Sequence, residues 1–128
     1  MTKLDSQIED LQKAISRLDE VLKMEKTDTI RDSAIHRFEI VFDLAWKTLK
    51  NYLEEYCNVA CNSPRSCFKE GFLNGIIEHN EFWLDICKER NYVAHTYKEV
   101  LADKIYTDLP KALENFKKLL EKISVPLK

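Results

Sequence analysis

Apolar residues near the start of the chain recur at alternating steps of four and three, at Leu4, Ile8, Leu11, Ile15, Leu18 and Leu22. This spacing places them on one face of an α-helix, which we expect from about Thr2 to Met24. A second helix is predicted from about Ile30 to Tyr56, because two apolar rows run along it and the Thr27-Asp28-Thr29 segment before it offers N-caps. A helix with so wide an apolar face should lie at the centre of a bundle or be shared with a partner.

Three further helices are expected. Ser63 is a suitable N-cap and Pro64 a suitable first residue for a short helix ending near Leu73. The next helix is predicted from about Asn80 to Asn91. Its apolar face comprises Trp83, Ile86 and Cys87, and the next position on this face is Arg90. The last apolar row consists of Leu101, Ile105, Leu109, Ala112, Phe116, Leu119 and Ile123. Pro110 lies inside this row without changing its phase, which predicts one kinked helix or two helices meeting end to end.

The scarcity of turn residues supports a helical fold. The chain has 128 residues but only two glycines and three prolines, so sheets joined by tight turns are disfavoured. We therefore predict an all-α fold, an antiparallel up-and-down bundle of four main helices plus a short helix, with the last helix kinked at Pro110. The sequence contains no repeat or low-complexity segment, and we expect a single domain over residues 1–128.

Charge and targeting signals limit the classes of function. The formal net charge is −2, whereas proteins that bind nucleic acids are often strongly basic, so any contact with RNA would need a local basic cleft. The first residues mix charges throughout, and no apolar run approaches the length of a membrane span. These features predict a cytoplasmic protein without a membrane partner.

The chain contains four cysteines, Cys57, Cys61, Cys67 and Cys87. In the cytoplasm we expect them to be reduced. Cys57 and Cys61 have helical spacing, but there is no CxxC pair and no histidine close by in sequence. We therefore expect neither a bound metal nor a cofactor.

The segment from Arg90 to Tyr97 combines a guanidinium, an amide, an imidazole and a phenol within eight residues. Arg90 keeps its positive charge at any relevant pH and suits a phosphate or the charge that builds on phosphorus during its transfer. His95 can give or take a proton near neutral pH. Cleavage of RNA through its 2′-hydroxyl needs both functions and requires no metal, so Arg90 and His95 are candidate catalytic residues.

Helix geometry restricts this interpretation. Five residues along a straight α-helix leave two side chains about 140° apart, so Arg90 and His95 would not converge on one helix. His95 and Tyr97 share a side only in extended chain. We therefore expect a helix end near residues 91–94. A homodimer that builds a composite site would also bring the groups together, and the surplus of apolar helix surface favours such a dimer.

A structural interpretation of the same residues stays open. Arg90 could pair with an acidic neighbour while His95 caps a helix, and an R-x4-H spacing alone is a weak signal. The position of Arg90 on an apolar row favours a functional role, because buried arginines are uncommon unless they are paired or functional.

Several segments along nearly the whole chain form a more specific pattern. They are Phe38-Glu39, the run from Leu44 to Leu53, Ser63-Pro64-Arg65, Trp83, Arg90-Asn91 and His95-Thr96-Tyr97. With these segments the chain resembles the HEPN superfamily, and within it the HepT-like group, also called nucleotidyltransferase substrate-binding proteins. The resemblance implies an HEPN-like bundle and a ribonuclease toxin of a toxin-antitoxin module.

The resemblance also implies roles for particular residues. Arg90 and His95 would be catalytic at a homodimer interface, and Asn91 would support the site and contact RNA. Tyr97 would be the tyrosine that a small cognate nucleotidyltransferase antitoxin of the MNT type modifies with AMP (AMPylation). Two other functions remain open: a non-catalytic substrate- or nucleotide-binding subunit of a nucleotidyltransferase complex, and a helical dimerisation scaffold.

Overall fold

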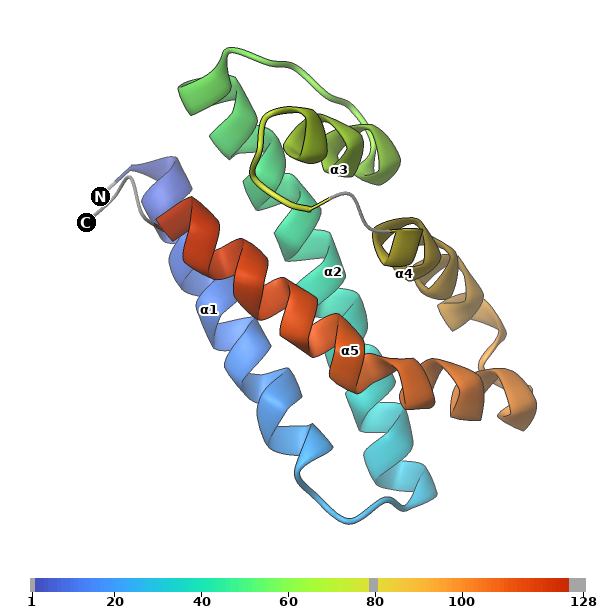
Figure 1. The fold of residues 1–128 in the computed structure, drawn as a ribbon. Coiled ribbons are helices and arrows are strands. Elements are labelled where there is room, and N and C mark those ends of the chain that lie inside the picture. Colours follow the sequence, from blue (N-terminus) through green and yellow to red (C-terminus); the bar gives the residue numbers. More distant parts are fainter. Residues whose placement is uncertain (1, 79–80, 125–128) are drawn as a thin grey trace.

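The computed structural model describes residues 2–78 and 81–124 of the chain (Figure 1). Its α-helices are α1 (Lys3–Leu22), α2 (Asp28–Cys57), α3 (Pro64–Leu73), α4 (Glu81–Tyr92) and α5 (Glu99–Ser124), and a short 3-10 helix, η1 (Val93–His95), joins the last two. Within these residues there is no strand. The predicted all-α fold is confirmed.

The bundle is built around α2. Helices α1, α2 and α5 pack against one another, α3 packs on α2, and α4 contacts α3, η1 and α5. Figure 1 shows α1, α2, α4 and α5 running alternately down and up, with α3 lying near the C-terminal half of α2. This is the antiparallel arrangement that the apolar rows predicted. Helix α5 continues through Pro110, so the last row forms one helix rather than two.

Side-chain caps set the helix starts. Helix α1 begins with a reciprocal capping box in which the Thr2 hydroxyl accepts from the Asp5 N–H and the Asp5 carboxylate accepts from the Thr2 N–H, both at 3.1 Å. Of the three N-caps proposed for the second helix, Thr27 takes the role. Ser63 caps α3, with Pro64 as its first residue, as predicted.

Aromatic rings join four helices in the core. Phe116 of α5 is 0% exposed and lies between Phe38 of α2 and Trp83 of α4, with ring centroids 6.3 and 5.8 Å away. Trp83 in turn stacks on Phe68 of α3 at 4.6 Å. The position of α4, and of the candidate site at its end, is therefore tied to the centre of the bundle.

The cysteines depart from the expectation that all four are reduced. Cys61, in the loop before α3, and Cys67, within α3, form a disulfide, and their Cα atoms lie 5.2 Å apart. The expectation came from the inferred compartment, whereas the fold places these two side chains against each other. Cys57 and Cys87 are free thiols.

Within residues 2–78 and 81–124, no helix is both long enough and apolar enough to cross a lipid bilayer.

Candidate active site at the end of α4

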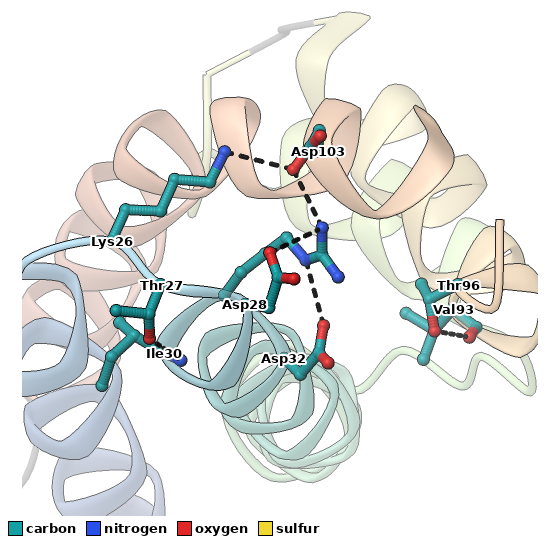
Figure 2. A network of polar contacts seen from close by, with 9 residues as sticks. Lys26, Thr27, Asp28, Ile30, Asp32, Val93, Thr96 and Asp103 are labelled. Carbon is teal, nitrogen blue, oxygen red and sulfur yellow. Dashed lines mark hydrogen bonds and ion pairs between the residues drawn. The ribbon is translucent and has the colours of Figure 1, made fainter. Parts of the chain in front are cut away.

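The backbone changes course between Arg90 and His95. Helix α4 ends at Tyr92, and η1 covers Val93 to His95. The Thr96 hydroxyl donates to the Val93 carbonyl at 3.0 Å, which fixes the turn after η1 (Figure 2). The predicted helix end near residues 91–94 is thus confirmed, and the two candidate catalytic residues lie on different elements.

A polar network fixes the start of α5, which follows this turn. Figure 2 shows the Asp103 carboxylate of α5 reaching Lys26 and the first turn of α2, with contacts of 3.1 Å to Lys26 Nζ and 3.2 Å to Arg31 Nη1. Arg31 is only 5% exposed and also contacts Asp28 and Asp32. Hydrogen bonds from Lys26 and Arg31 lower the pKa of Asp103. The network therefore anchors α5, and with it the turn that carries His95, to the N-terminus of α2.

Arg90 is held by two carboxylates from α2. Its Nη1 lies 3.0 Å from Glu39 Oε2, its Nε lies 3.3 Å from Asp43 Oδ1, and its Nη2 lies 3.4 Å from Asp43 Oδ2. The Arg90 side chain is 29% exposed, so it is half-buried rather than part of the core. A guanidinium has five N–H donors, so these contacts leave N–H groups on both Nη atoms for a phosphate.

A surface cleft of about 390 Å³ opens beside Arg90. It lies where α2, α4 and the start of α3 meet, and its lining comprises Phe42, Asp43, Trp46, Ser63, Pro64, Arg65, Cys87, Arg90 and Asn91. We call it the Arg90 cleft. Two of its residues, Arg90 and Asn91, were predicted as site residues from the sequence, and the structure brings them together here.

His95 and Tyr97 lie outside the lining of the Arg90 cleft. Their rings meet edge to face, with centroids 6.1 Å apart, so the two side chains share a side in a 3-10 turn. The expectation that only an extended chain would bring them together was wrong. Among the described residues no contact joins the Arg90 guanidinium to the His95 imidazole, so one chain presents two separate pairs, Arg90 with Asn91 and His95 with Tyr97.

Two titratable groups beside Arg90 have shifted pKa values. Burial raises the pKa of the Cys87 thiol to about 11, so this cleft residue remains a neutral thiol at neutral pH and is not a nucleophile. Burial also raises the pKa of Glu89, which is 6% exposed. Lys104 opposes that shift by donating to Glu89 Oε1 at 2.8 Å, whereas Oε2 is buried without a hydrogen-bond partner among the described residues.

The raised pKa of Glu89 predicts a pH dependence of stability. Because its folded-state pKa lies above the unfolded value, Glu89 favours folding most when protonated, and this contribution is lost as the pH rises through the folded-state pKa. We expect Glu89→Gln to reduce the fall in unfolding free energy as the pH rises above 4.5, the ordinary value of the carboxyl pKa, measured by urea denaturation at several pH values. The exposed Glu121→Gln is the matched control. A wild-type and a Glu89→Gln profile with the same slope would contradict the prediction.

Exposed apolar side chains lie on the elements around the turn. Val100 is 81% exposed and Tyr97 is 76% exposed, and Tyr92 and Ile40 are exposed as well. Ile40 directly follows Glu39, which contacts Arg90. The surplus apolar surface inferred from the sequence therefore includes residues on the elements that flank η1, which carries His95.

The chain is similar to a known protein family over most of its length. Residues 6–125 match the family described as nucleotidyltransferase substrate binding protein like. The chain belongs to this family. The match covers almost the whole chain and confirms the resemblance drawn from the short sequence segments.

Individual proteins support the family assignment. The chain is 26% identical over 100 residues to the Haemophilus influenzae protein named "Probable ribonuclease HepT", covering 75% of this chain and 68% of that protein. It is 30% identical to a Thermus thermophilus protein of known crystal structure, with a TM-score of 0.85 over 88% of this chain and 98% of that one. The H. influenzae protein HI0074, described as revealing the fold of a substrate binding domain of a nucleotidyltransferase, shares the fold at 23% identity, with a TM-score of 0.68 over 94% of this chain and 96% of that one.

In this member of the nucleotidyltransferase substrate binding family, sequence reasoning missed the acidic side of the site. Glu39 and Asp43 are four residues apart and so lie on one face of α2, which was a usable signal for paired carboxylates. Their shared partner, Arg90, lies 47 residues beyond Asp43 and only the fold brings it to them. The family pattern includes Glu39 but assigns it no role.

Proposed function

We propose that the chain is an HEPN ribonuclease toxin of a toxin-antitoxin module that cleaves RNA as a homodimer, with Arg90 and His95 as catalytic residues. The observation that carries this proposal is the break after α4, which keeps a guanidinium beside a cleft and exposes an imidazole on the next element. The relative named "Probable ribonuclease HepT" supports the same activity.

The chemistry follows from these two groups. His95 takes the proton of a ribose 2′-hydroxyl, and the 2′-oxygen attacks the adjacent phosphorus. The bond from phosphorus to the 5′-oxygen breaks, and that oxygen takes a proton from water. The hydroxide so formed takes the proton held by the His95 imidazolium, which restores the base. The Arg90 guanidinium stabilises the negative charge on the phosphoryl oxygens, and Asn91 supports it as a hydrogen-bonding group in the same cleft. The products are a 2′,3′-cyclic phosphate and a 5′-hydroxyl.

The dimer completes the site in this proposal. Within one chain, Arg90 and His95 belong to separate pairs, so a second copy related by a twofold axis would bring two sets of groups to one RNA strand. The exposed apolar side chain of Val100 would supply part of the interface and leave the Tyr97 phenol accessible.

Tyr97 is the proposed target of the antitoxin. Its exposed phenol would attack the α-phosphorus of ATP held by a cognate MNT-type nucleotidyltransferase, losing its proton as pyrophosphate leaves. The product carries AMP on the tyrosine oxygen next to His95. It adds bulk and negative charge where the RNA phosphate would approach, and so would silence cleavage.

The test uses the chain purified alone and after incubation with the nucleotidyltransferase and magnesium ATP. We expect the untreated dimer to cleave single-stranded RNA in EDTA and to leave cyclic phosphate ends. The treated chain should carry AMP on the peptide containing Tyr97 and lose activity. Tyr97→Phe should stay unmodified, whereas the control Tyr56→Phe, at another exposed tyrosine, should be modified as wild type. Intact RNA after incubation with the unmodified dimer would remove the nuclease proposal, and AMP on another residue would remove the role of Tyr97.

A second candidate function is supported by the pairing of Arg90 with Glu39 and Asp43. Two carboxylates neutralise the guanidinium, which suits a non-catalytic subunit that presents substrate or nucleotide to a nucleotidyltransferase. Such a subunit would bind RNA or nucleotide with equal affinity in the wild-type and His95→Ala forms and would cleave neither.

A further inference from the structure

A second cleft adjoins the Arg90 cleft along α3. It measures about 560 Å³ and lies between α3 and α4. Its lining comprises Ser63, Arg65, Ser66, Phe68, Lys69, Phe72, Leu73, Ile77, Glu78, Trp83 and Leu84, and is mostly apolar. We call it the α3–α4 cleft. Ser63 and Arg65 line both clefts, so Arg65 stands at their junction.

The charges of the two clefts differ from that of the whole chain. Arg65, Arg90 and Asp43 line the Arg90 cleft, and Arg65, Lys69 and Glu78 line the α3–α4 cleft. Each cleft therefore has two cations and one carboxylate, although the protein as a whole carries a net charge of −2. A negatively charged ligand is the complementary occupant.

Arg65 and Arg90 differ in how much of their charge is neutralised. Arg90 contacts two carboxylates, whereas Arg65 is exposed and forms no ion pair with any described residue. A phosphate approaching Arg90 must compete with Glu39 and Asp43, but one approaching Arg65 meets no such competition. Arg65 is thus the stronger point of attachment for a phosphate in these clefts.

The α3–α4 cleft also suits a nucleobase. The stacked rings of Phe68 and Trp83 line it but are only 2% and 5% exposed, so Leu73 and Leu84, the exposed apolar side chains on its wall, are the main surface that a base would meet. A base that leaves the stack of a single strand gains by lying against aromatic and apolar side chains, and this gain depends little on base identity.

We propose that Arg65 holds a phosphate of single-stranded RNA at the junction of the two clefts, while the neighbouring base enters the α3–α4 cleft. The proposal rests on RNA being the substrate of the Arg90 cleft. It assigns Arg65 to binding rather than to the chemical step. It also explains how a chain of slightly negative net charge attracts RNA, because the attraction is confined to the cations of these clefts.

The test measures binding separately from cleavage. A fluorescein-labelled single-stranded decamer of uridine is titrated with the His95→Ala chain, and the dissociation constant is read from fluorescence anisotropy. We expect Arg65→Ala in this background to raise the dissociation constant about tenfold and to lower the salt dependence of log K by about 0.7, the value for one phosphate contact with a single strand. Leu84→Asp, an exposed change in the apolar wall, should also weaken binding about tenfold. Arg17→Ala, an exposed arginine on α1, is the matched control and should bind as the parent.

The outcomes separate this proposal from the proposed function. An unchanged dissociation constant for Arg65→Ala would overturn the phosphate contact, even if wild type cleaves RNA. If Leu84→Asp weakens the binding of a duplex of the same length as much as it weakens the binding of the single strand, the base pocket is overturned, because duplex bases cannot enter it. If Leu84→Asp instead abolishes capture of the nucleotidyltransferase and leaves RNA binding intact, the cleft is a protein-docking surface and the proposal is wrong. If the wild-type chain binds RNA without cleaving it, and Arg65→Ala weakens that binding, the subsite is supported and the nuclease proposal is rejected.

Discussion

Replacing His95 with alanine is expected to lower the rate of RNA cleavage by about 10²–10⁴-fold, the usual contribution of a general base. The reason is that the His95 imidazole is the base that removes the 2′ proton in the proposed mechanism, and the Cys87 thiol of the Arg90 cleft, buried with a raised pKa, does not replace it. The measurement is the single-turnover cleavage rate of a labelled RNA in EDTA. Growth of cells that express each form gives a second readout.

This substitution separates catalysis from folding. The His95 side chain is exposed, and its described contact is the edge-to-face approach of Tyr97, so its loss should change the unfolding free energy by less than about 0.5 kcal/mol. Arg90→Ala is a less direct test, because it would also leave Glu39 and Asp43 without their shared cation.

The control is His36→Ala, which removes another exposed histidine; its Nδ1 lies 3.8 Å from Glu39 Oε1, whereas Arg90 contacts the other oxygen of that carboxylate. It should cleave RNA at the wild-type rate. Equal cleavage by wild type and His95→Ala, prepared in the same way, would show that the activity does not use this imidazole.

Replacing Phe116 with alanine is expected to lower the unfolding free energy by about 3–5 kcal/mol. The side chain is fully buried between Phe38 and Trp83, so its loss leaves a cavity where α2, α4 and α5 meet. A change of this size should lower the Tm by roughly 10–20 °C for a chain of this length. Thermal unfolding followed by circular dichroism, at one fixed protein concentration, measures it.

Phe72→Ala is the matched control for this core substitution. Phe72 is an exposed aromatic residue on α3, and much of its side chain stays in water in the folded state. Its truncation should lower the unfolding free energy by less than about half of the effect of Phe116→Ala. A Phe116→Ala chain as stable as the Phe72→Ala chain would mean that the bundle closes around the vacated space.

The sequence predicted the features that depend on local chemistry. The start of α3 at Pro64 followed from the Ser63 cap, and the break after Arg90 followed from the rotation of an α-helix. Asn91 and Arg90 are adjacent at the end of α4 and line one cleft, while the supporting role of Asn91 stays a prediction.

Long-range pairings could not be predicted in the same way. The disulfide between Cys61 and Cys67 requires a loop conformation that residue spacing does not specify. On α4 the apolar row pointed to Arg90 as the buried charged residue, yet Glu89 is the more deeply buried, because Lys104 of α5 reaches across to it. These contacts depend on how the helices pack against one another. The apolar rows do not specify that packing closely enough to decide which of two adjacent residues is buried.

The distribution of the four cysteines gives this protein a single native attachment point for a probe. Cys61 and Cys67 are bonded to each other, and Cys87 is buried and has a raised pKa. Under non-reducing conditions Cys57, half-buried at the end of α2, is therefore the thiol that a maleimide dye or a nitroxide spin label would reach first. Labelling the unaltered chain at that position would place one reporter on each copy, so that dipolar spectroscopy or energy transfer could report the separation of two copies in solution.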